Sequence, residues 1–336
     1  MCVWLYSLRT LRTRGTSDPS IVDRLWSVLP QLYAWHWYFS APSARLLLMA
    51  TISSVWGIRL TLNFYMKGGF SGGEDHRWVE VRTWPGFSRG WEVFNAVFIV
   101  LYQLLLILAF SSPAAAAAYS TAPLNALDAT AAVLYLLLVA GEALADHQMF
   151  LFQREKYRRI RVGESAGVYA RGFIERGLWA YSRHPNYFCE VLIWWCYYLF
   201  SIASGEGLVN WTLVGPVFLT CLFVLPQASL DVTENLSSRK YPAYTDYQRT
   251  VSRFVPLPPK PDRELPPLSL GDRALVMWFV IGTAVTYLID IEQVLVADVS
   301  KYGQAGHTPV WPPAPCVHAI HWWTQWDRLP PPPPAG

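Results

Sequence analysis

Residues 177–190, with the sequence GLWAYSRHPNYFCE, lie where a basic polar segment, residues 154–176, changes to an apolar one, residues 191–203. Pro185 is typical of the first position of a helix, because proline tolerates that position and has no N–H to lose there. Proline also disfavours the helical conformation of the residue before it. The stretch therefore predicts a helix that begins at Pro185 and continues into the apolar segment.

Five polar side chains cluster around this helix start. Glu190 is four residues after Asn186 and three after Tyr187, so these three side chains share one face of the expected helix. Arg183 and His184 come just before it, where free backbone N–H groups and the helix dipole favour an anion. A cation, an imidazole and a helix N-terminus at the edge of an apolar segment predict a seat for a phosphorylated cofactor. Interfacial anchoring with an interhelical hydrogen-bond network is the alternative interpretation.

The composition indicates a membrane protein. Of the 336 residues, 53% are hydrophobic and only 15% are charged, which is more apolar than a soluble globular chain. The net charge of +3 is too small to indicate nucleic-acid binding. The five cysteines have neither metal-ligand nor disulfide-framework spacing, and Cys316, His318 and His321 do not make a metal site. We therefore predict no metal centre and no nucleic-acid partner.

Apolar segments of about the length that a bilayer needs recur along the chain. They predict an all-α, polytopic membrane helix bundle with about six transmembrane helices. The expected spans are residues 42–65, 93–112, 124–144, 186–203, 211–230 and 274–291.

Charge asymmetry predicts the orientation of this bundle. The loops at residues 67–92, 145–185 and 231–273 fall on one side and carry 19 of the 27 lysines and arginines. Loops rich in lysine and arginine remain on the cytosolic side of a membrane. The segments that flank the Arg-His-Pro stretch are therefore expected in the compartment that holds reduced nicotinamide cofactors.

Residues 177–190 resemble the Arg-His-Pro-Asn-Tyr-Phe-Gly-Glu signature of the DUF1295 proteins, relatives of steroid 5-alpha-reductases and sterol reductases. Cys189 stands where the signature has glycine. The resemblance extends, in family order, over about residues 19–258. Its other points are residues 23–27 (DRLWS), 56–60 (WGIRL), 145–148 (ADHQ) with Phe152 and Lys156, and 241–256. A hydrophobic helix that usually precedes the DRLWS element has no clear counterpart in residues 1–20.

The resemblance implies a fold of the steroid 5-alpha-reductase and isoprenylcysteine methyltransferase type. It also implies an NADPH-dependent oxidoreductase, embedded in the membrane, that reduces a C=C bond of a steroid, sterol or related lipid. We expect the endoplasmic reticulum as its location. The expected division is an N-terminal segment (1–40), the reductase-like membrane domain (41–258), a proline-rich linker (259–273), an extra membrane helix (274–296) and a proline-rich tail (297–336).

For the segment after the third span, the resemblance implies cofactor contacts. Asp146 and Gln148 would contact the ribose or nicotinamide half, although an acid here also fits an ion pair with an arginine such as Arg59. Arg154 and Lys156 would bind the phosphates, because a guanidinium fork suits a 2′-phosphate. The alternative for this basic run is a flank that touches anionic lipid.

The remaining implied roles fall on the signature and the C-terminal element. The cofactor would contact Arg183, His184, Asn186 and Glu190, with Glu190 orienting its amide, and Tyr187 is the candidate proton donor. Tyr244 and Tyr247, in a Tyr-Pro-x-Tyr-x-x-Tyr pattern, would close over the adenine end or form an interfacial aromatic belt.

Two other functions remain open at this point. An S-adenosylmethionine-dependent methyltransferase of the isoprenylcysteine carboxyl methyltransferase type has a similar Arg-His-Pro motif and helical hairpin. A non-catalytic membrane scaffold would keep the fold without turnover, which Cys189 and the altered N-terminal region make a serious alternative. Measuring whether the protein binds NADPH or S-adenosylmethionine distinguishes the reductase from the methyltransferase.

Overall fold

The structure, a computed structural model, describes residues 2–8, 17–70, 76–85, 87–165 and 167–260. These residues form helices, and no strand occurs among them. The all-α prediction is therefore confirmed for this part of the chain. The expected span at 274–291 and the tail at 297–336 lie outside the described residues.

The chain divides into two compact units. The first, here called the bundle unit, comprises residues 1–64, 72–142 and 186–240. The second, the polar unit, comprises residues 65–71, 143–185 and 241–336. Each unit combines segments that are distant in the sequence. The helices at Ala44–Met66 and Ala126–Val162 each contribute residues to both units.

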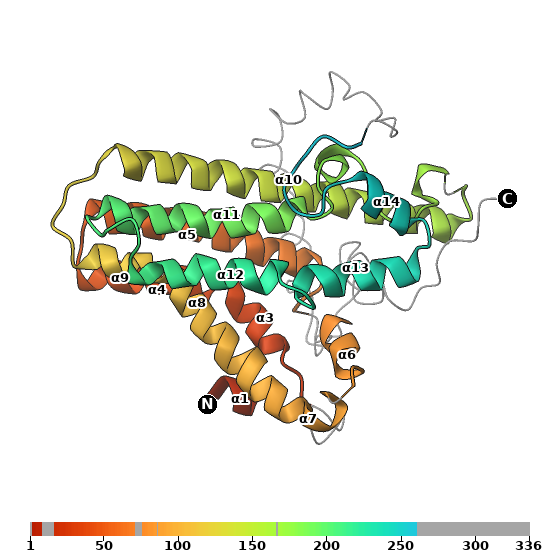
Figure 1. Cartoon of the computed structure of the whole chain (residues 1–336), viewed down its shortest axis with the longest axis horizontal. Helices are drawn as coiled ribbons and strands as arrows, with labels where there is room; N and C mark the ends of the chain where they lie inside the picture. Colours follow the sequence, from red (N-terminus) through yellow and green to blue (C-terminus); the bar gives the residue numbers. More distant parts are fainter. Residues whose placement is uncertain (1, 9–16, 71–75, 86, 166, 261–336) are drawn as a thin grey trace, which may run out of the picture. The chain divides into compact units, whose positions relative to one another are not determined.

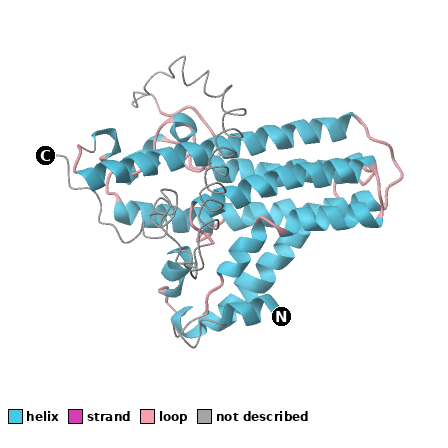
Figure 2. Ribbon diagram, turned by 180° about the vertical axis from the view of Figure 1, so that it is seen from behind, coloured by secondary structure: helices cyan, strands magenta, loops and turns pink. Residues whose placement is uncertain are grey.

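The bundle unit contains most of the helices. Within it, α5, α11 and α12 run side by side (Figure 1; Figure 2 from behind). Its helices are α1 (Cys2–Ser7), α3 (Ser20–Trp26), α4 (Leu29–Ser40), α5 (Ala44–Met66), α6 (His76–Arg82), α7 (Phe87–Phe94), η2 (Asn95–Tyr102), α8 (Gln103–Ser111), α9 (Pro113–Ala118), the first part of α10 (Ala126–Val162), α11 (Pro185–Ala203), η5 (Trp211–Leu213), α12 (Val214–Val224) and α13 (Ser229–Lys240). The polar unit contains the rest of α10 with η3 (Gly167–Tyr169), η4 (Gly177–Ala180) and α14 (Tyr244–Thr250).

Several of these helices are long and apolar enough to cross a membrane. Four such candidates occur among the described residues, at Ala44–Met66, Arg89–Ser111, Ala126–Val162 and Trp211–Lys240. Helix α11 is 19 residues long and coincides with the expected span at 186–203, but it is not one of these four candidates. The membrane character of the chain is thus supported, and the number of six spans stays a prediction.

The second span is not a regular α-helix. Its middle part, η2, is a π-helix of eight residues. The rings of Phe94, Phe98 and Tyr102 stack along it, with centroids 5.0 and 5.2 Å apart. Because a turn of a π-helix contains more residues than a turn of an α-helix, side chains four residues apart lie more nearly one above the other, which permits this stacking. Sequence periodicity predicted only a continuous apolar helix here.

Aromatic rings fill the centre of the bundle unit. The Trp194 ring of α11 lies 4.8 Å from Trp56 of α5 and 4.2 Å from Phe110 of α8. Tyr197, one turn further along α11, lies 5.4 Å from Trp194. These four side chains are all fully buried. Burying such large rings is a main source of stabilisation for the packing of these helices.

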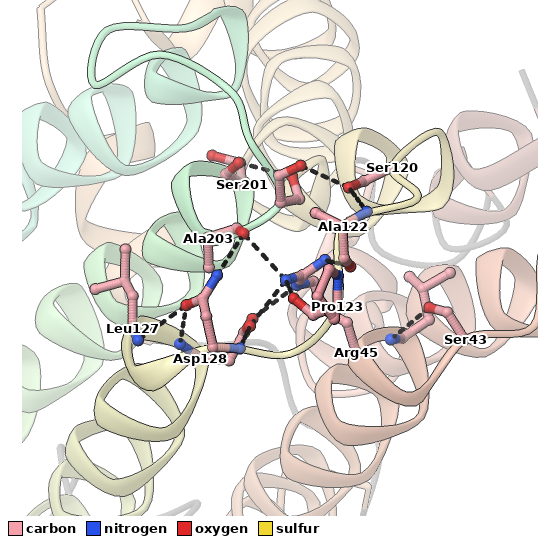
Figure 3. Close-up of polar contacts among 12 residues, drawn as sticks. Ser43, Arg45, Ser120, Ala122, Pro123, Leu127, Asp128, Ser201 and Ala203 are labelled. Carbon is pink, nitrogen blue, oxygen red and sulfur yellow. Dashed lines mark hydrogen bonds and ion pairs between the residues drawn. The ribbon is translucent and has the colours of Figure 1, made fainter.

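A buried ion pair connects α5 with α10 at one end of the bundle unit (Figure 3). The Arg45 guanidinium at the start of α5 donates to both Asp128 carboxylate oxygens of α10, at 2.7 and 2.8 Å. It also donates to the carbonyls of Ala122, Pro123 and Ala203, at 2.8–3.0 Å. This cluster, here called the Arg45 clamp, connects α5, the loop before α10 and the end of α11.

Candidate functional site

In the polar unit, Asp146 is buried and forms an ion pair. Its Oδ1 atom lies 3.2 Å from the Lys67 ammonium, which follows α5. In the bundle unit, Glu142, one turn earlier on α10, pairs with Arg59 of α5. The expected ion pair with Arg59 is therefore formed by Glu142 and not by Asp146. Asp146 instead pairs with Lys67, which the sequence did not indicate.

Gln148 fixes the beginning of the signature to α10. The backbone N–H of Leu178 donates to Gln148 Oε1 at 3.0 Å. Gly177 has a φ of +60°, and a Cβ at this position would lie 2.4–2.6 Å from the Gln148 amide. The Trp179 indole N–H donates to the Ala145 carbonyl at 3.0 Å. Two motifs about thirty residues apart in sequence are thereby in direct contact.

Arg154 and Lys156 differ in their surroundings. The Lys156 side chain is buried, and its ammonium donates to the Gly172 carbonyl at 2.9 Å and to the Tyr241 hydroxyl at 3.3 Å. The Arg154 side chain is exposed, with its guanidinium 5.8 Å from the centre of the Phe150 ring. Of these two cations, Arg154 is the one presented at the surface of the polar unit.

The next arginines of the basic run are balanced by acids. Arg158 forms ion pairs with Glu155 at 2.8 Å and with Glu164 at 2.7 Å. Arg159 pairs with Glu155 at 2.8 Å. The hydrogen bonds from Arg158 lower the pKa of the Glu164 carboxyl. Because these charges are satisfied within the protein, this part of the run has less net charge for a lipid surface than its arginine count suggests.

Arg183 holds the C-terminal part of the polar unit. Its guanidinium donates to the carbonyls of Gln248 and Val251 at 2.8 and 2.6 Å, and its backbone N–H donates to the Ser252 carbonyl at 2.8 Å. The side chain is 7% exposed. His184 is also buried, and its backbone N–H donates to Ser182 Oγ at 3.1 Å.

Tyr244 and Tyr247 belong to an aromatic core of the polar unit. Their rings lie 5.1 and 5.4 Å from the Phe173 ring, and both side chains are buried. The Tyr247 hydroxyl donates to the Trp179 carbonyl. Since neither ring lies at the surface, an interfacial belt does not describe them.

The signature residues after Pro185 lie in the bundle unit. The Glu190 carboxylate is buried and accepts hydrogen bonds from the indoles of Trp56 and Trp194, at 2.9 and 3.0 Å. Tyr187 is half-buried, with its ring 4.9 Å from the Phe223 ring. Asn186, in the first turn of α11, is also half-buried. The two indole donors were not anticipated, although Trp56 lies in the WGIRL element.

The predicted site residues thus divide between the two units. The bundle unit holds Asn186, Tyr187 and Glu190, and the polar unit holds Asp146, Gln148, Arg154, Lys156, Arg183, His184, Tyr244 and Tyr247. Among the described residues, no group of three or more His, Cys, Asp or Glu side chains could hold a metal ion. Cys316, His318 and His321 lie outside that part of the chain.

In the described residues, these features define an all-helical architecture with four helices long and apolar enough to cross a membrane, and a polar unit that contains several of the signature motifs. The chain belongs to the DUF1295 family, described as "Protein of unknown function", which matches residues 11–251. It is also similar to an uncharacterized protein of Schizosaccharomyces pombe, with 36% identity over 264 residues that cover 72% of this chain and 73% of that relative. No solved structure matches. The predicted family membership is confirmed.

Proposed function

We propose that the protein is a membrane-embedded, NADPH-dependent oxidoreductase that reduces a C=C bond of a steroid, sterol or related lipid. The observation that supports this most is the contact between Gln148 and Leu178, because it joins the Asp-x-Gln motif of α10 to the Arg-His-Pro signature. Two motifs that serve one cofactor need such proximity. We further propose the endoplasmic reticulum as the location.

The residues of the polar unit fit a nicotinamide dinucleotide in distinct ways. Arg154 is exposed and can form charge-assisted hydrogen bonds with a 2′-phosphate. Lys156 and Arg183 already donate to backbone carbonyls, so they support the cofactor site chiefly by fixing the segments around it. The Asp146 carboxylate can accept a hydrogen bond from a ribose hydroxyl. His184 lies next to the start of α11, where an anion is favoured.

The bundle unit supplies the proposed reaction groups. NADPH, when bound, supplies a hydride to one carbon of the double bond. We assign Tyr187 as the donor of the proton to the other carbon, because it is half-buried on the signature face of α11. Glu190, held by two indoles, would orient the cofactor amide. Replacing Tyr187 with Phe should abolish turnover and leave NADPH affinity unchanged.

Cofactor binding tests this proposal directly. The full chain, purified in lipid nanodiscs, should bind NADPH at least about tenfold more tightly than NADH, which corresponds to about 1.4 kcal/mol. Arg154→Gln should remove most of this preference and leave NADH affinity nearly unchanged. Arg161→Gln, which removes an exposed cation seven residues further along α10, is the matched control and should keep the preference.

The same titration distinguishes the other functions. Binding of S-adenosylmethionine in place of NADPH would replace the proposal with a methyltransferase. Binding of neither compound would favour a non-catalytic scaffold. Equal affinity for NADPH and NADH would mean that the exposed arginine does not meet a 2′-phosphate.

A further inference from the structure

A cavity of about 320 Å³ opens between α6 and α13 in the bundle unit (Figure 1). One wall comes from Glu80 of α6 and from Trp84 and Pro85 just after that helix. The other wall comes from the turn before α13 and from α13 itself. The volume is at the lower end of the range for ligand pockets, about 300–1,000 Å³, so the cavity fits a small group and not a whole lipid.

Polar side chains of α13 form a row along this cavity. Asp231, Asn235 and Arg239 line it and are four residues apart, so they lie on one face of the helix. At 1.5 Å per residue, the row is about 12 Å long. The Arg239 guanidinium donates to the Glu80 carboxylate, which joins the two walls. The guanidinium is therefore paired at one end of the row, and the Asp231 carboxylate lies at the other end.

The turn before α13 fixes the Asp231 carboxylate. Gln227, which also lines the cavity, has a φ of +62°, a conformation that residues other than glycine rarely adopt. Its backbone N–H donates to Asp231 Oδ2 at 2.6 Å. Strained residues of this kind persist where the surroundings hold them, and they are common at binding sites. A carboxylate accepts about four hydrogen bonds, so Asp231 can bind this turn and a ligand together.

The chemistry of the walls favours a cation that carries N–H donors. Two carboxylates and one guanidinium line the cavity, so its formal net charge is −1. The carboxylate and amide oxygens accept hydrogen bonds, and the Trp84 ring attracts a cation. A primary ammonium group, with three donors, uses both features. A quaternary ammonium group has no N–H to donate and is bound best by a cage of several aromatic rings, of which the described lining residues supply one.

The cavity lies where the membrane surface is expected. Val224 and Leu225, at the end of α12, are exposed apolar residues that come directly before the Gln227 turn. The span expected from the sequence ends at residue 230, and the segments at residues 67–92 and 231–273 are both expected on the cytosolic side. In this orientation, the cavity opens at the level of the lipid headgroups of the cytosolic leaflet.

We propose that this cavity binds a primary ammonium group, with the Asp231 carboxylate as its main hydrogen-bond acceptor and the Trp84 ring against its charge. The ethanolamine headgroup of a membrane lipid presents such a group at this level, and a soluble amine of the cytosol is the other source. The proposal does not rest on the reductase reaction, because none of the residues assigned to that reaction or to its cofactor lines the cavity.

Calorimetric titration of the full chain in lipid-free maltoside micelles tests the proposal. Glycerophosphoethanolamine, the headgroup without acyl chains, should bind at least about tenfold more tightly than glycerophosphocholine, which corresponds to one charge-assisted hydrogen bond. Asp231→Asn should weaken the binding of the ethanolamine compound by about the same factor. Glu206→Gln, which removes an exposed acid between α11 and α12 in the same unit, is the matched control and should bind as the parent does.

A second variant keeps the test valid if Asp231→Asn disturbs the turn. Asn235 is exposed on α13, where lysine is a good helix former. Asn235→Lys should bring its own ammonium group into the cavity and abolish binding, with an unchanged thermal midpoint. Nanodiscs then identify the source of the ligand. Phosphatidylethanolamine nanodiscs should weaken the binding of the soluble headgroup by competition and phosphatidylcholine nanodiscs should not, whereas equal affinity in both would assign the cavity to a soluble amine.

Four outcomes would overturn the proposal. They are that the protein binds neither headgroup compound, that it binds both equally, that Asp231→Asn and Glu206→Gln have the same effect, or that Asn235→Lys binds as the parent does. None of these outcomes bears on NADPH binding.

Discussion

Replacing Arg45 with Met should destabilise the bundle unit strongly. The change leaves the Asp128 carboxylate, 1% exposed, without its cation, and three carbonyls lose a donor. Breaking a buried ion pair by removing one partner costs about 3–5 kcal/mol. The backbone N–H of Asn125 still donates to Asp128 at 2.9 Å, so we expect the lower end of that range, about 3 kcal/mol.

A double-mutant cycle makes this prediction sharp. Asp128→Asn keeps the shape of the side chain and its contact with Asn125, but removes the charge. Combined with Arg45→Met, it leaves no buried charge, so the double variant should lose only about 1–2 kcal/mol, from carbonyls that lack a donor. The double variant should therefore be more stable than Arg45→Met alone, although it carries one more substitution.

The free energy of unfolding in mixed micelles, from titration with SDS, measures both variants. Arg239→Met is the control, because it breaks an ion pair in which the arginine is 68% exposed. Exposed pairs contribute about 0–1 kcal/mol, so little change is expected. The reasoning is refuted if Arg45→Met costs no more than the control, or if adding Asp128→Asn lowers stability further.

Three further predictions concern the polar unit and the orientation. Gly177→Ala should destabilise the folded protein by about 1–2 kcal/mol because of the left-handed backbone alone, and the clash with Gln148 should add to this cost. An unchanged thermal midpoint would contradict this prediction. Lys156→Met should destabilise the folded protein by about 1–3 kcal/mol, since it removes the donor to a buried carbonyl. The ratio of NADPH to NADH affinity should stay the same. Loss of that ratio would mean that Lys156 contacts the cofactor directly. A cysteine variant of Ser165 should be labelled from the cytosolic face of the membrane, and a cysteine variant of Thr121 from the opposite face. The reverse pattern would show that the predicted orientation is wrong.

Hydrophobic patterning was sufficient to predict the main helices. The first span was expected at residues 42–65 and is α5, and the helix start at Pro185 is observed. Both follow from local rules, apolar length and the conformational restriction of proline. The π-helix η2 was not predictable in this way, because its sequence is uniformly apolar and its geometry depends on how neighbouring rings pack.

Partners of the charged residues were harder to predict. Arg183 and Lys156 stand in motifs that suggest a phosphate ligand, but both side chains donate to carbonyls of other segments. A sequence shows which groups carry charge and does not show which distant carbonyls need a donor. The same limit explains why Lys67 was not recognised as the cation beside Asp146.

Cys189 illustrates how the structure changes the meaning of a departure from the family signature. In sequence, a cysteine in place of glycine suggests crowding at a close contact and thus favours an inactive scaffold. In the bundle unit its sulfur lies against Gly141 of α10, at 3.3 Å from where a Cβ would be. Because Gly141 has no side chain, the facing helix provides the room that the signature glycine would otherwise leave. The substitution therefore does not argue against the proposed function, in which Tyr187 and Glu190 on either side of Cys189 would supply the polar groups.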